Sequence, residues 1–369
     1  MRKGWALFGI MAAALTFGAQ NPAPAAEEKV LNVYNWSDYI APDTIEKFTK
    51  ATGIKVNYDV YDSNETLFAK LQAGQSGYDL VFPSATPFLA QGIKAGIFKT
   101  LDRSKITRYA TLDPATLRSM EIADPGNTHA VPYMVAATGI GYNIDKIKKI
   151  LGADAKPDSW SLLFDPAVVA KLKECGVSLL DTPTEVFPAA LFYAGKNGAS
   201  ADKADLAAAS DIVMKIRPFI KYFHSSKYIN DLANGDTCVA HGYVGDLVQA
   251  RTRANEANKG VHIAIFIPKE GAVLNIDAAA IPADAPHPGN AEAFIDFVLQ
   301  PDLIAAVTNA VGYANAVMPA KALVKKEFQT DPAIYPPAEM LAKEFELPLV
   351  TPDYERLRTR AWTKVKTGL

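Results

Sequence analysis

Short runs with strand periodicity alternate with longer runs of helical periodicity in the first part of the chain. Residues 31–36, 54–60 and 78–83 are strand-like, with apolar side chains at about every second position. Residues 42–52 and 63–73 lie between them, carry apolar side chains three or four positions apart, and are each followed by glycine. This β-α-β-α-β order predicts an α/β fold with a mostly parallel sheet, helices on both faces and right-handed crossovers.

The alternation continues in later parts of the chain. Buried strands are expected at residues 176–180, 237–243 and 261–267. A long helical region through Phe294 is expected to end near Gly312.

A chain of 369 residues exceeds the usual size of a single core, so two domains are expected. The prolines and glycines between Pro132 and Gly141 suit a crossing between them, and residues 277–281 suit the return. We expect a ligand cleft between two lobes, formed by residues 26–135 plus about 277–320 and by residues about 136–276 plus 321–369.

Ligands of parallel sheets bind beyond the carboxyl ends of the strands. Trp36, Ser37, Asp38 and Tyr39 follow the first predicted strand, and Ser84 follows the third. These side chains should therefore face one cleft.

The N-terminus has the order of a secretory signal peptide. Arg2 and Lys3 precede an apolar run of 14 residues, which is short for a membrane span of about 20. An Ala-x-Ala site predicts cleavage near Ala25, and a permanent anchor is the alternative. Export into an oxidising compartment makes a disulfide the default for the two cysteines, Cys175 and Cys238, with two buried thiols as the alternative.

The composition is that of a folded protein, with 49% hydrophobic and 21% charged residues. The 38 basic side chains against 40 acidic ones give no excess of positive charge for a phosphate backbone, so nucleic acid is excluded as an expected partner. Removal of the signal peptide takes away Arg2 and Lys3, leaving 36 basic against 40 acidic side chains and a charge of −4.

Motifs of the common catalytic and metal sites are missing from the sequence. There is no G-x-S-x-G, H-E-x-x-H or phosphate-binding loop, and the five histidines lack ligand spacing, so we expect no enzyme activity, no cofactor and no metal. An exported two-lobed α/β protein without such motifs is most simply a binding protein that holds its ligand between the lobes. An exported hydrolase with an Asp or Glu base is a remote alternative.

Seven longer motifs are spread over the mature chain, at residues 34–40, 58–65, 132–134, 138–143, 222–226, 228–235 and 358–366. In these motifs the sequence resembles the periplasmic polyamine-binding proteins of ABC importers, particularly the putrescine-binding type. The resemblance implies a monomeric, periplasmic protein with the type II two-lobed binding fold and two hinge crossings, which delivers its ligand to an inner-membrane permease.

The resemblance also implies a Cys175–Cys238 disulfide and a set of ligand-binding positions. These positions are Trp36, Ser37, Asp38, Tyr39, Ser84, Glu185, Tyr243, Asp246, Arg253, Asn275, Asp277 and Tyr313.

A polyamine needs anionic acceptors for its ammonium ends and apolar walls for its methylenes. The acids Asp38, Glu185, Asp246 and Asp277 suit the first task, although each could instead be a helix cap or a surface charge. The aromatic side chains of the set suit the second, although single aromatics are more often core residues.

Two positions depart from the family pattern, which usually has Trp at Tyr243 and an aromatic residue at Asn275. Asn275 replaces a wall with a hydrogen-bonding group, which favours a longer, more polar or guanidino-bearing amine. Putrescine is the first choice of ligand from the resemblance, and this departure leaves spermidine, cadaverine, agmatine and an ω-amino acid as alternatives. A chemosensory receptor role is a further alternative to uptake.

Overall fold

The computed structural model describes Met1 and residues 27–368, so the predicted signal peptide and its cleavage site near Ala25 lie outside the described residues. The strands are β1 Val30–Trp36, β2 Lys55–Tyr61, β3 Leu80–Val81, β4 Ala130–Asn143, β5 Val177–Leu179, β6 Tyr222–Phe223, β7 Val239–Tyr243, β8 Ile263–Phe266, β9 Ala272–Ala280, β10 Ala314–Asn315 and β11 Glu344–Phe345.

The helices cover both faces of these strands. They are α1 Thr44–Thr52, α2 Asn64–Gln72, α3 Ala90–Lys94, α4 Pro114–Met120, α5 Ile144–Leu151, α6 Ser161–Phe164, α7 Pro166–Leu172, α8 Pro183–Tyr193, α9 Lys203–Ile216, α10 Tyr228–Asn234, α11 Val244–Ala257, α12 Pro288–Val298, α13 Pro301–Val311, α14 Lys326–Gln329, α15 Ala338–Leu341 and α16 Pro352–Thr367.

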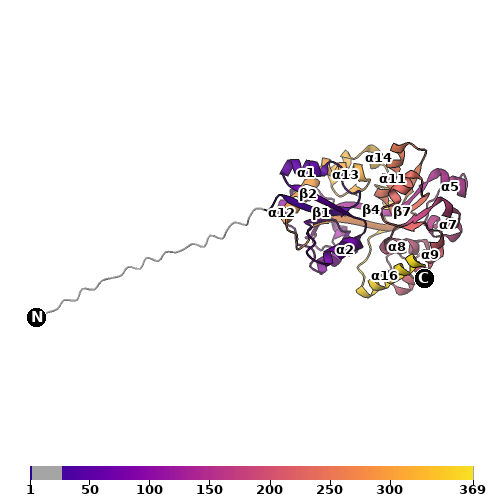
Figure 1. Cartoon of the computed structure of the whole chain (residues 1–369), viewed down its shortest axis with the longest axis horizontal. Coiled ribbons are helices and arrows are strands. Elements are labelled where there is room, and N and C mark those ends of the chain that lie inside the picture. The colour runs from indigo at the N-terminus through magenta and orange to yellow at the C-terminus, as the bar shows by residue number, and fades with distance from the viewer. Residues whose placement is uncertain (2–26, 369) are drawn as a thin grey trace.

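The strand order β2-β1-β3-β9-β4-β7-β5-β6 passes through two lobes. Parallel pairs make up the outer parts, β2-β1-β3 in one lobe and β7-β5-β6 in the other. In Figure 1, α1, α2 and α12 surround β1 and β2 at one end, while α5, α7 and α9 lie at the other. The predicted two-lobed α/β fold is confirmed.

The long strands β4 and β9 add antiparallel pairs to each predicted parallel sheet. Residues 130–137 of β4 pair with β9, whereas residues 138–142 pair with β7 in the second lobe. A single strand of 14 residues therefore runs from one lobe into the other. Its antiparallel neighbours follow from this crossing, because β9 brings the chain back in the opposite direction.

Local sequence signals set the ends of the first helices. Gly53 takes a left-handed conformation, with φ 71°, at the C-cap of α1. The Ser63 hydroxyl accepts a hydrogen bond from the Thr66 backbone N–H and caps α2. The structure thus confirms both predicted helices.

The helical region predicted through Phe294 is present and ends at Gly312, the C-cap of α13. It consists of two helices, α12 and α13, which meet at 81°. The second helix begins at Pro301, whose ring and missing N–H are incompatible with the interior of a continuous helix. Within residues 27–368, no single helix is long and apolar enough to cross a bilayer, and only this bent pair reaches that length and composition together.

The two cysteines form a disulfide in the second lobe. Cys175 precedes β5 and Cys238 precedes β7, and their Cα atoms lie 5.5 Å apart. Because β5 and β7 are paired neighbours, the covalent bond joins two strands that are already adjacent. The predicted disulfide is present.

Candidate functional site

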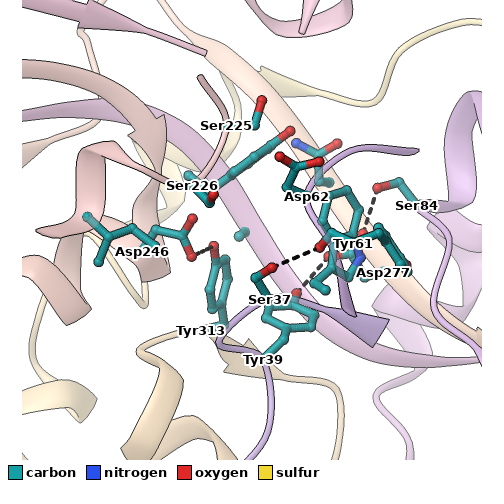
Figure 2. Close-up of a pocket in the computed structure, with 15 residues that line it drawn as sticks. Ser37, Tyr39, Tyr61, Asp62, Ser84, Ser225, Ser226, Asp246, Asp277 and Tyr313 are labelled. Carbon is teal, nitrogen blue, oxygen red and sulfur yellow. Dashed lines mark hydrogen bonds between the residues drawn. The ribbon is translucent and has the colours of Figure 1, made fainter. Parts of the chain in front are cut away.

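A cavity lies where the two lobes meet. Figure 2 shows its side chains arriving from both lobes and pointing toward one another. Its lining is formed by Trp36, Ser37, Tyr39, Tyr61, Asp62, Ser84, Ala136, Ser225, Ser226, Ile229, Tyr243, Asp246, Asn275, Asp277 and Tyr313.

Asp277, near the end of β9, marks one side of the cavity. Its Oδ2 accepts a hydrogen bond of 2.6 Å from the Tyr39 hydroxyl, and its Oδ1 accepts one of 2.6 Å from Ser84 Oγ. Ser84 is itself held by the Asn64 side chain, which donates to its Oγ and accepts from its backbone N–H. The segments after β1 and β3 therefore fix both oxygens of this carboxyl group.

Asp246, in the first turn of α11, marks the opposite side (Figure 2). Its Oδ1 accepts a 2.7 Å hydrogen bond from the Tyr313 hydroxyl, and its Oδ2 accepts one of 2.7 Å from the Tyr228 hydroxyl. The Tyr228 oxygen also accepts from the Tyr243 backbone N–H at 3.1 Å. A carboxylate near a helix N-terminus is additionally favoured by the helix dipole.

Aromatic rings form the walls between the two acids. The Trp36 indole N–H donates to the Phe82 carbonyl at 2.8 Å, which fixes the ring at the end of β1. The Trp36 ring centroid lies 4.8 Å from that of Tyr61 and 6.1 Å from that of Tyr243, which belongs to the other lobe. Rings from both lobes therefore meet edge to face and form one aromatic wall of the cavity.

Asn275 separates Glu185 from the cavity. The Asn275 side-chain N–H donates to Glu185 Oε1 at 3.2 Å. Glu185 is only 3% exposed, and its Oε2 is buried without a hydrogen-bond partner. Asn275 thus lines the cavity, and the predicted acid lies behind it.

Asp38 and Arg253 meet at the edge of the site. Arg253 Nη2 donates to Asp38 Oδ1 at 2.8 Å, which joins α11 to the segment after β1. Both side chains are partly exposed, at 45% for Asp38 and 33% for Arg253, so solvent weakens this ion pair. Together with Glu185, they are the three predicted residues that the structure does not place on the cavity wall.

Burial changes the protonation of the acids. It raises the pKa of Asp246 and Asp277 to about 6, despite hydrogen bonds that lower it. It raises the pKa of Glu185 to about 8. At neutral pH the two cavity acids are mainly anionic, whereas Glu185 is mainly neutral.

The tyrosine hydroxyls act as hydrogen-bond donors. Burial raises the pKa of Tyr39 and Tyr313 well above the usual value for tyrosine, with the neighbouring carboxylates adding to the effect. Both hydroxyls therefore stay protonated and donate hydrogen bonds, Tyr39 to Asp277 and Tyr313 to Asp246.

The sequence analysis missed six lining residues, namely Tyr61, Asp62, Ala136, Ser225, Ser226 and Ile229. Tyr61 ends β2, so the strand-end rule applied to that predicted strand would have found Tyr61 and Asp62. Ser225 and Ser226 follow β6, a strand of two residues that was not predicted. Ala136 lies inside β4, where no local signal marks it. In the described part of the chain, no three His, Cys, Asp or Glu side chains gather closely enough to hold a metal ion.

Two lobes joined by crossing strands, with a buried polar and aromatic cavity between them, define a two-lobed solute-binding protein. The chain matches the sequence profile of the bacterial extracellular solute-binding protein family over residues 43–336. It belongs to that family.

Curated relatives and a solved structure agree with this assignment. The chain is 50% identical to the putrescine-binding periplasmic protein SpuD of Pseudomonas aeruginosa, over 97% of this chain and 98% of that one. It is 51% identical to the putrescine-binding periplasmic protein PotF of Escherichia coli, over 100% of this chain and 99% of that one. The spermidine/putrescine transporter substrate-binding protein PotD of Streptococcus pneumoniae superposes with a TM-score of 0.74 at 27% identity. The match covers 92% of this chain and 99% of that one.

Proposed function

We propose that this protein captures a polyamine, with putrescine as first choice, between its lobes and delivers it to an ABC-type inner-membrane importer. The observation that carries the proposal is the pair Asp246 and Asp277, two buried carboxyl groups on opposite sides of one aromatic-walled cavity. A diamine places an ammonium group at each end and methylenes between. Charge-assisted hydrogen bonds contribute about 1.5–3 kcal/mol each, and an aromatic face over a cation about 0.5–2 kcal/mol.

The relatives support this proposal. SpuD and PotF are named for putrescine binding and match nearly the whole chain. An ω-amino acid fits less well than a diamine, because its carboxylate would face Asp246 or Asp277. Cadaverine, agmatine and spermidine remain compatible with two acids and aromatic walls.

The proposed ligand-binding residues are the nine predicted positions that line the cavity: Trp36, Ser37, Tyr39, Ser84, Tyr243, Asp246, Asn275, Asp277 and Tyr313. We assign Glu185 to a supporting position behind Asn275. We assign the Asp38–Arg253 ion pair to the contact between the lobes rather than to the ligand.

We further propose that the protein is exported, cleaved near Ala25 and active as a periplasmic monomer. Its lobes comprise residues 26–135 plus about 277–320, and residues about 136–276 plus 321–369. The change of β4 pairing partner between Ala137 and Thr138 supports the first boundary.

The test is ligand-dependent stability of the mature protein, with putrescine, cadaverine, agmatine and spermidine as probes. A ligand at 100 times its dissociation constant should stabilise the fold by about 2.7 kcal/mol, which raises the melting temperature. The uncharged diol 1,4-butanediol is the matched control, because it has the length of putrescine without its charges. An unchanged melting temperature with all four amines at millimolar concentration would refute the proposal.

A further inference from the structure

One face of α11 carries three polar side chains toward the first lobe. Asp246, Gln249 and Arg253 are spaced at i, i+3 and i+7, so they lie along one side of the helix. Asp246 lines the cavity and Arg253 reaches Asp38 at its edge. Gln249 lies between them and is not a cavity residue.

Gln249 is buried, and its side chain makes two hydrogen bonds to the first lobe. Its Nε2 donates to the backbone carbonyl of Asp38 and to that of Val311, each at 3.2 Å. Its Oε1 accepts from Arg253 Nη2 at 3.3 Å, so its amide is satisfied on both sides. A long polar side chain buried in this way costs conformational entropy, which these bonds must offset.

The two acceptor carbonyls lie one or two residues before ligand-site tyrosines. Asp38 is one residue before Tyr39, and Val311 is two residues before Tyr313. Tyr39 holds Asp277, and Tyr313 holds Asp246. One side chain of the second lobe therefore touches one segment that positions each acid, that of Tyr39 for Asp277 and that of Tyr313 for Asp246.

The packing around this contact leaves no room for larger side chains. A Cβ atom at Gly245 would lie 2.1 Å from the Tyr313 ring. A Cβ atom at Gly312, where φ is +75°, would lie 2.7 Å from Val248 Cγ1. Helix α11 thus fits closely against residues 312–313, and glycine on each side permits the approach.

We propose that Gln249 is a positioning residue that holds the lobes closed over the ligand. It ties α11 to the carbonyls of Asp38 and Val311 and so keeps Tyr39 and Tyr313 against the two acids. The inference rests on the proposed amine binding. Because these bonds join the lobes, they form after the ligand has entered, and their loss acts on ligand release rather than on ligand entry.

The test measures association and dissociation rates of putrescine by stopped-flow fluorescence, with Trp36 in the cavity as reporter. Gln249→Leu keeps the approximate side-chain size and removes the hydrogen bonds. It should raise the dissociation rate about tenfold, since two neutral hydrogen bonds are lost, and leave the association rate within about twofold. The melting temperature of the ligand-free protein should stay close to that of the original.

Gln300→Leu is the matched control. The Gln300 amide also donates to a backbone carbonyl, that of Phe297 at 3.1 Å, but within its own lobe. Both putrescine rate constants should be unchanged in this variant.

Gln249→Met is a second variant that keeps the test open should Gln249→Leu fold poorly, because its unbranched side chain has the length of glutamine and makes none of the three hydrogen bonds. It should likewise release putrescine faster. Original dissociation rates in the folded variants would overturn the inference, as would a loss of affinity due to slower association alone. Failure of the original protein to bind any of the four amines would instead refute the proposed function.

Discussion

The Tyr39 hydroxyl donates a hydrogen bond of 2.6 Å to Asp277 Oδ2, although 238 residues separate the two in the chain. Tyr39 follows β1 and Asp277 lies near the end of β9. The bond therefore ties a loop to a strand that returns from the other lobe, and it aims one buried carboxyl group at the cavity.

Replacing Asp277 by Asn should weaken putrescine binding at least tenfold. The variant keeps an acceptor for Tyr39 or Ser84 but loses the negative charge, and a charge-assisted hydrogen bond contributes about 1.5–3 kcal/mol. The ligand-free protein should melt near the original temperature, because the cost of burying the charge is removed together with part of the hydrogen bonding from Ser84 and Tyr39. Isothermal titration calorimetry measures the affinity. The same exchange at exposed Asp211 on α9 should leave the putrescine affinity unchanged. An equal loss of affinity in both variants would contradict the assignment of Asp277 to the ligand site.

Putrescine affinity should fall as the pH drops from 7.5 to 5. Burial raises the pKa of Asp246 and Asp277 to about 6, so both become protonated over this range and lose attraction for a cation. Binding at pH 6 should release protons, which calorimetry in buffers of different ionisation enthalpy detects. Asp277→Asn should show a smaller pH effect, and equal affinity at pH 5 and 7.5 would disprove this linkage.

Putrescine affinity falls with falling pH, but the same two acids should make the ligand-free protein more stable as the pH falls. Their pKa values are higher in the folded state than in the unfolded chain, so the folded protein binds more protons between about pH 4 and 6. Their contribution to the free energy of unfolding therefore grows as the pH falls through this window.

Replacing Asn275 by Phe should shift ligand preference toward putrescine. Asn275 presents a polar amide to the ligand, whereas a phenyl ring offers an apolar wall to methylenes. The variant also removes the hydrogen bond to Glu185, so Asn275→Leu, which loses the same bond without adding a ring, is the control. Competition binding with putrescine, agmatine and spermidine gives the ranking. An unchanged order of the three amines would show that this side chain does not set selectivity.

His241 should make the ligand-free protein sensitive to acid. Both ring nitrogens are buried without hydrogen-bond partners, with the Trp160 ring 5.2 Å away, and burial lowers the pKa of His241 to about 3. The unfolded chain binds a proton below about pH 6.5 while the folded protein does not, so stability falls as the pH drops.

The effect should amount to about 2 kcal/mol at pH 5 relative to pH 7.5. Between pH 7.5 and pH 5, the His241→Leu variant should lose about 2 kcal/mol less stability than the original protein, as measured by urea unfolding at the two pH values. The same exchange at His262, which is exposed and pairs with Asp145, should leave the original difference in place. An identical pH response in His241→Leu would rule out this histidine as the cause.

Much of the fold was predictable because its signals are local. Gly53 ends α1 since the helix needs a left-handed residue there, and Ser63 caps α2 with its own hydroxyl. The signal that separates α12 from α13, Pro301, is equally local, but the apolar pattern continues on both sides of it and predicts a single helical region. Strand ends also located Trp36 and Ser84 in the cavity.

The site was predictable only as a set of candidates. Asp38, Glu185, Asp246 and Asp277 are similar in sequence, each an acid near the end of a strand or the start of a helix. In the structure, two of them line the cavity, one lies behind Asn275, and one points to Arg253 at the edge. No local sequence pattern distinguishes the acids that line the cavity from those that lie behind it or at its edge.

The sequence by itself determined the periodicities, caps and crossings that divide this protein into two α/β lobes, because those depend on neighbours a few residues apart. Only the tertiary structure decided which acids line the cavity, because the hydrogen bonds that position them join distant segments, with Tyr39 and Asp277 separated by 238 residues. Burial at that meeting point then sets the charge of each acid, because the cost of removing a carboxylate from water depends on its surroundings in space.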